Sequence, residues 1–269
     1  MYFYYVIPIK KYINGIPKFK MIKTSDIQKI VKLTLISGYI KDVAPLSLIV
    51  VGKAGVGKTE NIRHWKNSKS LVITDLNYSG LVQLLIKKNT LKHLIIPDFI
   101  KITMKKSSTK DNLISFLNSC IEDGLNQIEG YFHHKFKGRK IGIITSTTKA
   151  SFTQNKKTWK NMGFTDRMLI CSYSYSKKTI EEIKEYINSE KFKTEQEDIQ
   201  KLKITEVKSN KILNAYFNTE VKDSLRSLKQ FQTLAKCNAL NEGRNKVLKE
   251  DISEILRLCK FLNEDYTEI

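Results

Sequence analysis

The sequence is poor in cysteine, arginine and acidic residues, and it has no long apolar segment. Its four cysteines, Cys120, Cys171, Cys237 and Cys259, form no CxxC pair and have no histidine at metal-ligand spacing. This predicts reduced, mostly buried thiols rather than a disulfide framework or a zinc site. The longest apolar runs, such as residues 46–51, fall far short of the roughly 20 residues that cross a bilayer.

The N-terminal stretch also lacks the features of a secretion signal. No basic region precedes its apolar residues, and no small-residue cleavage site follows them. We therefore expect a soluble, cytoplasmic protein with no membrane partner. At 269 residues, the chain is long enough for one large domain and a smaller one.

Acidic residues are scarce relative to basic ones. The chain has 27 Asp and Glu against 47 Lys and Arg, a formal net charge of +20, and only six of the basic residues are arginine. The codon bias of an AT-rich genome would explain the preference for lysine, but not the shortage of acids. A charge of this size favours a polyanionic partner, and nucleic acid in particular.

Apolar periodicity predicts alternating strands and helices, followed by helices alone. Continuous apolar runs, typical of strands in a buried parallel sheet, occupy residues 46–51, 71–74, 94–97, 141–145 and 168–172. Helical patterns occupy residues 26–37, 78–88, 109–123, 179–189, 223–241 and 249–262.

This order predicts an α/β fold with a doubly wound parallel sheet over residues 25–176 and a smaller all-helical region over residues 177–269. Residues 1–24 form a basic, aromatic arm, in which the Asn14-Gly15 pair is a hairpin signal.

The segment GKAGVGKT fits the phosphate-binding pattern G-x-x-x-x-G-K-[ST] and directly follows an apolar run. Its glycines let backbone N–H groups curl around the phosphates of ATP, and Lys58 places a cation on the β- and γ-phosphates. Thr59 and Asp98, which ends HLIIPD, are the expected Mg²⁺ ligands. The candidate ATP-binding residues are Gly52, Lys53, Ala54, Gly55, Val56, Gly57, Lys58 and Thr59.

From about residue 26 to 265 the chain resembles the AAA+ ATPases. It is most similar to the clade with a β-hairpin before sensor 1, which includes minichromosome-maintenance helicases and MoxR-type chaperones. The resemblance rests on the phosphate loop, the helix NLISFLNSCIEDG at 112–124, a hairpin segment at 125–140 and the strand IGIITSTT. It implies an oligomeric ATPase, a hexameric ring or a filament, with a helical C-terminal lid.

The resemblance also implies roles for single residues. Thr145 or Ser146 falls at sensor 1, which would contact the γ-phosphate or the attacking water. Arg167 falls at the arginine finger, which enters the ATP site of the neighbouring subunit. Arg226, near the start of a helix in the lid segment, falls at sensor 2. Arginine suits both positions because its planar fork binds phosphate oxygens bidentately.

One position departs from the family pattern. Phe99 follows Asp98, where the family usually has the glutamate that serves as general base. Either another residue supplies the base or hydrolysis is slow. Asp75, after the second strand, and Glu122, in an acidic turn, are candidates that the sequence does not rank.

Residues 130–165 contain no acid. In the resembled helicases the hairpin points into the channel of the ring and touches DNA, so its bases would neutralise phosphates and its aromatics stack on bases. The alternative is a solvated hairpin whose aromatics pack on the core. The candidate DNA contacts are Lys135, Lys137, Arg139 and Lys140, and the interleaved aromatics are Tyr131, Phe132, Phe136, Phe152 and Trp159.

Together these features predict an oligomeric ATPase in DNA replication or a related DNA transaction: a helicase, a helicase loader or an initiator. Its expected cofactors are ATP and Mg²⁺, and its expected partners are DNA, copies of itself and a replication or mobile-element protein. A MoxR-like protein remodeller is an alternative, because NALNEGRNKV resembles that lid equally well. An ATP-binding scaffold with little turnover is another, because of Phe99.

Overall fold

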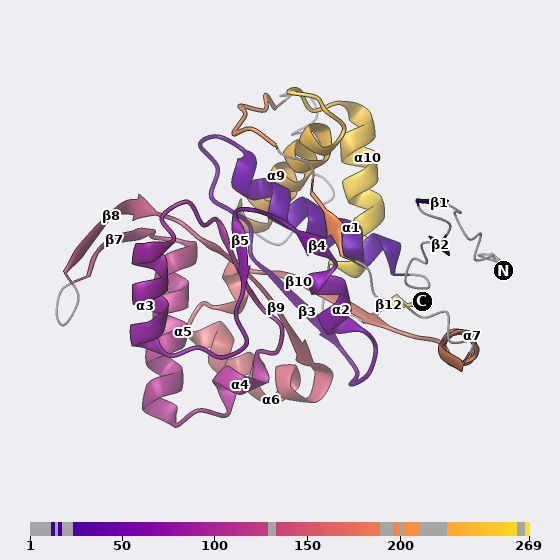
Figure 1. Ribbon diagram of the computed structural model, residues 1–269, viewed down its shortest axis with the longest axis horizontal. Helices are drawn as coiled ribbons and strands as arrows, with labels where there is room; N and C mark the ends of the chain where they lie inside the picture. The colour runs from indigo at the N-terminus through magenta and orange to yellow at the C-terminus, as the bar shows by residue number, and fades with distance from the viewer. Residues whose placement is uncertain are drawn as a thin grey trace.

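The computed structural model describes residues 12–13, 16–17, 24–128, 133–188, 196–199, 202–209, 225–262 and 267–269. Within them the fold is α/β, built on a parallel sheet (Figure 1). From edge to edge the strands are β12 (Thr267–Glu268), β10 (Leu169–Ser174), β3 (Leu48–Gly52), β9 (Gly142–Thr148), β6 (His93–Ile96) and β5 (Ser70–Val72). The five predicted strands are confirmed, and the polar β12 was not predicted.

Helices connect and cover these strands. They are α1 (Ser25–Ile36), η1 (Ser37–Tyr39), α2 (Lys58–Arg63), α3 (Tyr78–Lys87), α4 (Ile100–Thr103), α5 (Ser107–Ile121), α6 (Lys149–Asn161), η2 (Thr165–Arg167), α7 (Lys177–Asn188), α9 (Leu225–Asn241), α10 (Lys249–Leu258) and η3 (Cys259–Phe261). The predicted helices are confirmed, but the four-residue α4 was missed, and so was α6. It buries only Ser151, Phe152 and Trp159, too few apolar positions for a visible pattern.

Both faces of the sheet are buried. Along β3, Leu48 and Val50 belong to one hydrophobic cluster with α1, α9 and α10, whereas Ile49 and Val51 belong to another with α3, α5 and α6. This alternation is what a strand covered on both faces requires. The continuous apolar run at residues 46–51 is therefore explained by burial on two sides.

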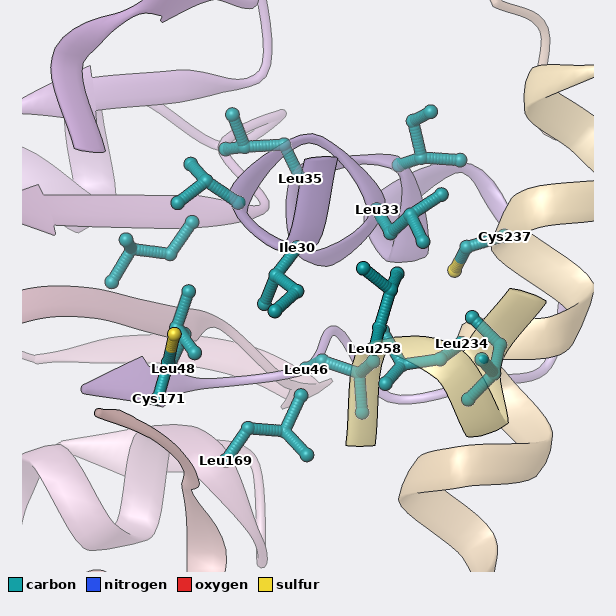
Figure 2. Close-up of a cluster of buried hydrophobic side chains, with 14 of the residues drawn as sticks. Ile30, Leu33, Leu35, Leu46, Leu48, Leu169, Cys171, Leu234, Cys237 and Leu258 are labelled. Carbon is teal, nitrogen blue, oxygen red and sulfur yellow. The ribbon is translucent and has the colours of Figure 1, made fainter. Parts of the chain in front are cut away.

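The C-terminal helices share a core with the sheet. Figure 2 shows the residues of α1 between those of the sheet and those of α9 and α10. The labelled residues are Ile30, Leu33 and Leu35 of α1, Leu46, Leu48, Leu169 and Cys171 in or beside the strands, and Leu234, Cys237 and Leu258 of the last two helices. All four cysteines are free thiols, and three are buried, as predicted.

Three small sheets complete the described structure. The hairpin expected within residues 125–140 is present: β7 (Leu125–Ile128) pairs antiparallel with β8 (His134–Arg139) and extends away from the body (Figure 1). Tyr131 and Phe132 lie outside the described residues.

The N-terminal arm also contains a hairpin: β1 (Tyr12–Ile13) pairs antiparallel with β2 (Ile16–Pro17), as the Asn14-Gly15 signal predicts. The other residues of 1–23 lie outside the description. β4 (Trp65–Lys66) pairs in parallel with β11 (Glu197–Asp198).

Candidate functional site

The phosphate loop, residues 52–59, connects the carboxyl end of β3 to the start of α2. Gly55 and Gly57 adopt left-handed φ angles of 78° and 71°, which side chains disfavour. A Cβ on Gly52 would come within 3.0 Å of the carbonyl oxygen of Tyr173. The left-handed backbone thus favours glycine at positions 55 and 57, and the close approach of β10 favours it at position 52, so a side chain at any of them would strain this cradle.

Lys58 spans this cradle. Its Nζ donates to the carbonyl oxygen of Lys53 at 2.6 Å. Burial lowers the pKa of Lys58, and the negative charges of Asp98 and Glu60 oppose that shift. The ammonium is therefore held at the mouth of the loop, beside Asp98, where an incoming anion would compete for it.

Asp98 and Thr59 offer oxygen atoms of the kind that Mg²⁺ prefers. Asp98 follows β6 and is exposed, and its Oδ1 accepts a 3.2 Å hydrogen bond from the backbone N–H of Ile100. Among the described residues no group of three or more His, Cys, Asp or Glu side chains could hold a metal. One carboxylate and one hydroxyl fit Mg²⁺ bound mainly through water and phosphate.

Strand β9 lies between the loop strand and the strand of Asp98. Both sensor 1 candidates sit on it, both are buried, and both hydroxyls are used internally. Thr145 Oγ1 donates to the carbonyl of Ile96 at 2.7 Å, and Ser146 Oγ donates to that of Pro97 at 2.6 Å. They therefore fix the end of β6, and with it the position of Asp98.

Thr147, on the same strand, is a hydroxyl residue that the sequence analysis did not single out. It pairs with Val51, one residue before the phosphate loop, and is buried. Its Oγ1 has no hydrogen-bond partner in the described part of the chain. The run TSTT places hydroxyls at four successive positions, so only the register of β9 against β3 distinguishes them.

Phe99 is a core residue. It is completely buried, stacks on Phe164 with ring centroids 5.2 Å apart, and meets Trp159 edge-on. Of the two acids considered as general base, Asp75 lies at the same edge of the sheet as the loop. A hydrogen bond from Lys105 lowers the pKa of Asp75, which keeps it ionised and makes it a weak base.

A buried tyrosine braces the phosphate loop from β10. The hydroxyl of Tyr173 donates to the carbonyl of Val56 at 2.8 Å and accepts from the side-chain amide of Asn61 at 2.9 Å. Burial holds the pKa of Tyr173 well above its ordinary value, so the phenol stays neutral. The sequence gives no signal for this contact, because the partners are 117 and 112 residues apart.

Arg167 and Arg226 meet at one carboxylate, far from the loop. Arg167 Nε lies 2.5 Å from Glu122 Oε2, and Arg226 Nη2 lies 2.6 Å from Glu122 Oε1. We call Glu122, Arg167 and Arg226 the arginine cluster. It borders a cavity lined by residues 42–47, which precede β3, whereas the loop follows β3. The five residues of β3, roughly 16 Å of extended chain, separate the two.

The hairpin presents fewer free cations than expected. Lys135 and Lys137 are exposed on β8. Arg139 instead donates to the backbone carbonyls of Leu85 and Lys88 at the C-terminal end of α3, and so caps that helix, and to the carbonyl of Leu91 in the connection to β6. Lys140 lines the cavity beside the arginine cluster. The structure thus separates four bases that the sequence grouped.

No protein-family model matches this chain, and a search of curated proteins finds no significant match. In the described part of the chain, no helix has both the length and the apolar character to cross a membrane.

Proposed function

We propose that the chain is a P-loop ATPase of the AAA+ type. The observation that carries the proposal is the phosphate loop at the end of a central parallel strand, with Lys58 across its mouth and Asp98 beside it. When bound, ATP and Mg²⁺ would supply the transferable phosphate and its charge neutralisation. Gly55 and Gly57 would leave room for the phosphates, and Thr59 and Asp98 would hold the metal.

Finer features of the fold support the same proposal. Hydrophobic clusters on both faces of the sheet are consistent with a doubly wound arrangement, and the helices after residue 176 would form the lid. Since α9 and α10 pack on α1, such a lid would move only if that contact opened or shifted. Thr147 is a better candidate than Thr145 or Ser146 for sensing the γ-phosphate, because its hydroxyl has no other described partner.

Arg167 and Arg226 would act on the nucleotide of a second copy. They lie beyond the opposite end of β3 from their own phosphate loop. An oligomer in which the loop of one copy faces the arginine cluster of the next would therefore complete each site. The two arginines would then stabilise charge on the transferred phosphoryl group.

Replacing Lys58 tests the nucleotide site. Lys58→Ala removes a charge-assisted hydrogen bond to phosphate, so we expect ATP affinity or turnover to fall about 10- to 100-fold. Lys53→Ala is the matched control, because Lys53 is exposed and contributes its backbone to the loop. Titration calorimetry with ATP and a phosphate-release assay give the two readouts. Equal behaviour of the two variants would contradict the site.

The process served by the ATPase is proposed to be a DNA transaction, such as helicase loading, replication initiation or unwinding. It rests on the net charge of +20 and on Lys135 and Lys137 along the projecting hairpin. Because Arg139 caps α3, fewer hairpin cations could contact DNA than the sequence indicated. A MoxR-like protein remodeller is therefore the second candidate. Phe99 in the core favours slow turnover, as in a scaffold.

Salt dependence separates the DNA function from remodelling. Each lysine that neutralises a phosphate adds about 0.7 to 0.9 to the slope of log affinity against log salt. Lys135→Gln with Lys137→Gln should therefore flatten the slope by about 1.4 to 1.8, whatever the DNA sequence. Lys157→Gln with Lys160→Gln, on exposed positions of α6, removes equal charge outside the hairpin. If both pairs change the slope alike, the hairpin has no special role.

A further inference from the structure

The cavity beside the arginine cluster is strongly basic. It has a volume of about 570 Å³. Its charged lining residues are the acids Asp42 and Glu122 and the bases Lys140, Arg167, Arg226, Lys229 and Lys236. In the described part of the chain, Lys229 and Lys236 have no ion-pair partner. Five cations around one cavity repel each other unless an anion occupies it.

Glu122 supplies that anion from within the chain. Its two carboxylate oxygens each engage a different arginine, and Lys140 adds a further favourable charge. Burial acts to raise the pKa of Glu122, but the hydrogen bond from Arg226 and the charge of Arg167 outweigh it, so the pKa is lowered and the carboxylate stays charged. One oxygen accepts a hydrogen bond from Arg226, and the other lies in ion-pair contact with Arg167. Two negatively charged oxygens between two guanidinium groups resemble part of a phosphate held by arginines.

We propose that this cavity is a binding site for a phosphate chain and that Glu122 occupies it until such a chain displaces the carboxylate from Arg167 and Arg226. Glu122 is then a built-in competitor. It holds Arg226 and, together with the carbonyl oxygen of Gly163, Arg167 in the free subunit, and its two ion pairs lower the affinity of the cavity for an external anion. The phosphate chain would come from a nucleotide bound to a second copy or from free polyphosphate. The nucleotide of a second copy as the source rests on the proposed function, whereas the anion site itself does not depend on it.

The test uses inorganic tripolyphosphate and the full chain with Lys58→Ala, which disables the other phosphate site. Adding Glu122→Gln should tighten tripolyphosphate binding about tenfold by titration calorimetry at fixed ionic strength, the order expected for removing two partly exposed ion pairs. Adding Arg167→Ala and Arg226→Ala to that variant should abolish the binding. Equal affinity with and without the Glu122→Gln substitution, or binding that survives loss of both arginines, would overturn the proposal.

Asp42→Asn is the matched control. Asp42 lines the same cavity, carries the same charge and has a φ of 58°, a left-handed value that asparagine tolerates. It should change affinity by less than about twofold, because it releases no arginine. An equal effect of Asp42→Asn and Glu122→Gln would mean that general charge, not displacement, controls binding. If Glu122→Gln does not fold, Glu122→Asp serves instead, since a side chain one methylene shorter cannot reach both arginines and should give an intermediate gain.

A second measurement distinguishes the two sources of phosphate. With Lys58 intact, ATP hydrolysis is followed against subunit concentration. If the phosphate chain belongs to a neighbouring copy, Glu122→Gln should lower the concentration of half-maximal activity about tenfold, whereas Asp42→Asn should lower it by less than about twofold. An unchanged concentration alongside tighter tripolyphosphate binding would overturn the neighbouring copy as the source. If the chain hydrolyses no ATP, the calorimetry still decides whether the anion site exists.

Discussion

The two ends of strand β3 differ in how their functional groups are assembled. At the carboxyl end, one continuous segment supplies the phosphate loop, and its lysine is held by a backbone carbonyl five residues away. At the amino end, the arginine cluster joins three segments, with Glu122 and Arg226 104 residues apart in the chain. The first arrangement is a sequence motif, whereas the second exists only after folding.

The difference also concerns what holds each cation before a ligand arrives. Lys58 contacts a carbonyl, which a phosphate can replace at little electrostatic cost. Arg167 and Arg226 contact a carboxylate, which a phosphate must displace from both. Under the proposed function the loop end would accept a nucleotide without losing an ion pair, whereas Glu122 already occupies the arginine end. If the two ends form one composite site, they should depend on each other in the ways set out below.

Arg167→Ala is expected to have the largest effect. An arginine acting on the transferred phosphoryl group in trans contributes about 10³- to 10⁵-fold to turnover, so hydrolysis should fall by at least about 10³-fold while ATP affinity changes little. Arg257→Ala is the control: Arg257 also forms ion pairs, with Asp26 and Glu254, but lies outside the cluster. Calorimetry and phosphate release separate binding from turnover.

Mixing two kinds of variant subunit tests whether the phosphate loop of one copy meets the arginine cluster of another. Arg167→Ala and Lys58→Ala subunits, each with strongly reduced hydrolysis alone, should recover part of the activity when mixed, because some interfaces combine both intact ends. Co-assembly is confirmed by light scattering. If co-assembled subunits show no recovery, the two ends of β3 do not form one site between copies, and the arginines lie outside the ATP site.

Phe99→Glu tests the effect of restoring the glutamate that the AAA+ pattern has at this position. Because Phe99 is enclosed by Phe164 and Trp159, the new carboxyl would be buried, and unfolding free energy should fall by about 3 to 5 kcal/mol. Burial raises the pKa of such a carboxyl, so the loss should be smaller at acidic pH and grow as pH rises. Phe99→Leu should cost less than about 1.5 kcal/mol. Faster hydrolysis by a stable Phe99→Glu protein would show that position 99 can reach the nucleotide.

Tyr173→Phe is expected to have the smallest effect of these substitutions. It leaves the carbonyl of Val56 and the amide of Asn61 without their shared partner, which should cost about 1 to 3 kcal/mol of stability. ATP affinity should also fall, because the phosphate loop loses its brace. Tyr175→Phe is the control, since the hydroxyl of Tyr175 has no partner among the described residues. Denaturant unfolding and ATP titration of both variants give the comparison; similar losses would argue against the brace.

Much of the fold could be read from local patterns. The five main strands and most helices follow from apolar periodicity, because a strand buried on both faces must be continuously apolar and an amphipathic helix must repeat with the turn. Helix α6 escaped because its buried face amounts to three residues and its start depends on the Thr148 side chain. Strand β12 escaped because two polar residues at a sheet edge need only backbone pairing.

The candidate site also has one part that local sequence patterns predict and another part that depends on tertiary contacts. The glycine spacing and Lys58 were visible because a tight glycine-rich loop constrains consecutive residues. The sequence could not show that Thr145 and Ser146 donate hydrogen bonds to the end of β6. Nor could it show that Phe99 packs in an aromatic cluster or that Arg139 caps α3. Those outcomes depend on which strand lies beside which.

By itself, the sequence determined the phosphate loop, the alternation of strands and helices and the excess of positive charge, because each arises from residues close together or from composition. Only the tertiary structure decided that Tyr173 braces the loop, that Thr147 stands beside it without a described partner and that Glu122 holds both arginines at the other end of β3. Contacts between segments far apart in the chain leave no local pattern, because strand order and register set them, not the residues next to them in the sequence.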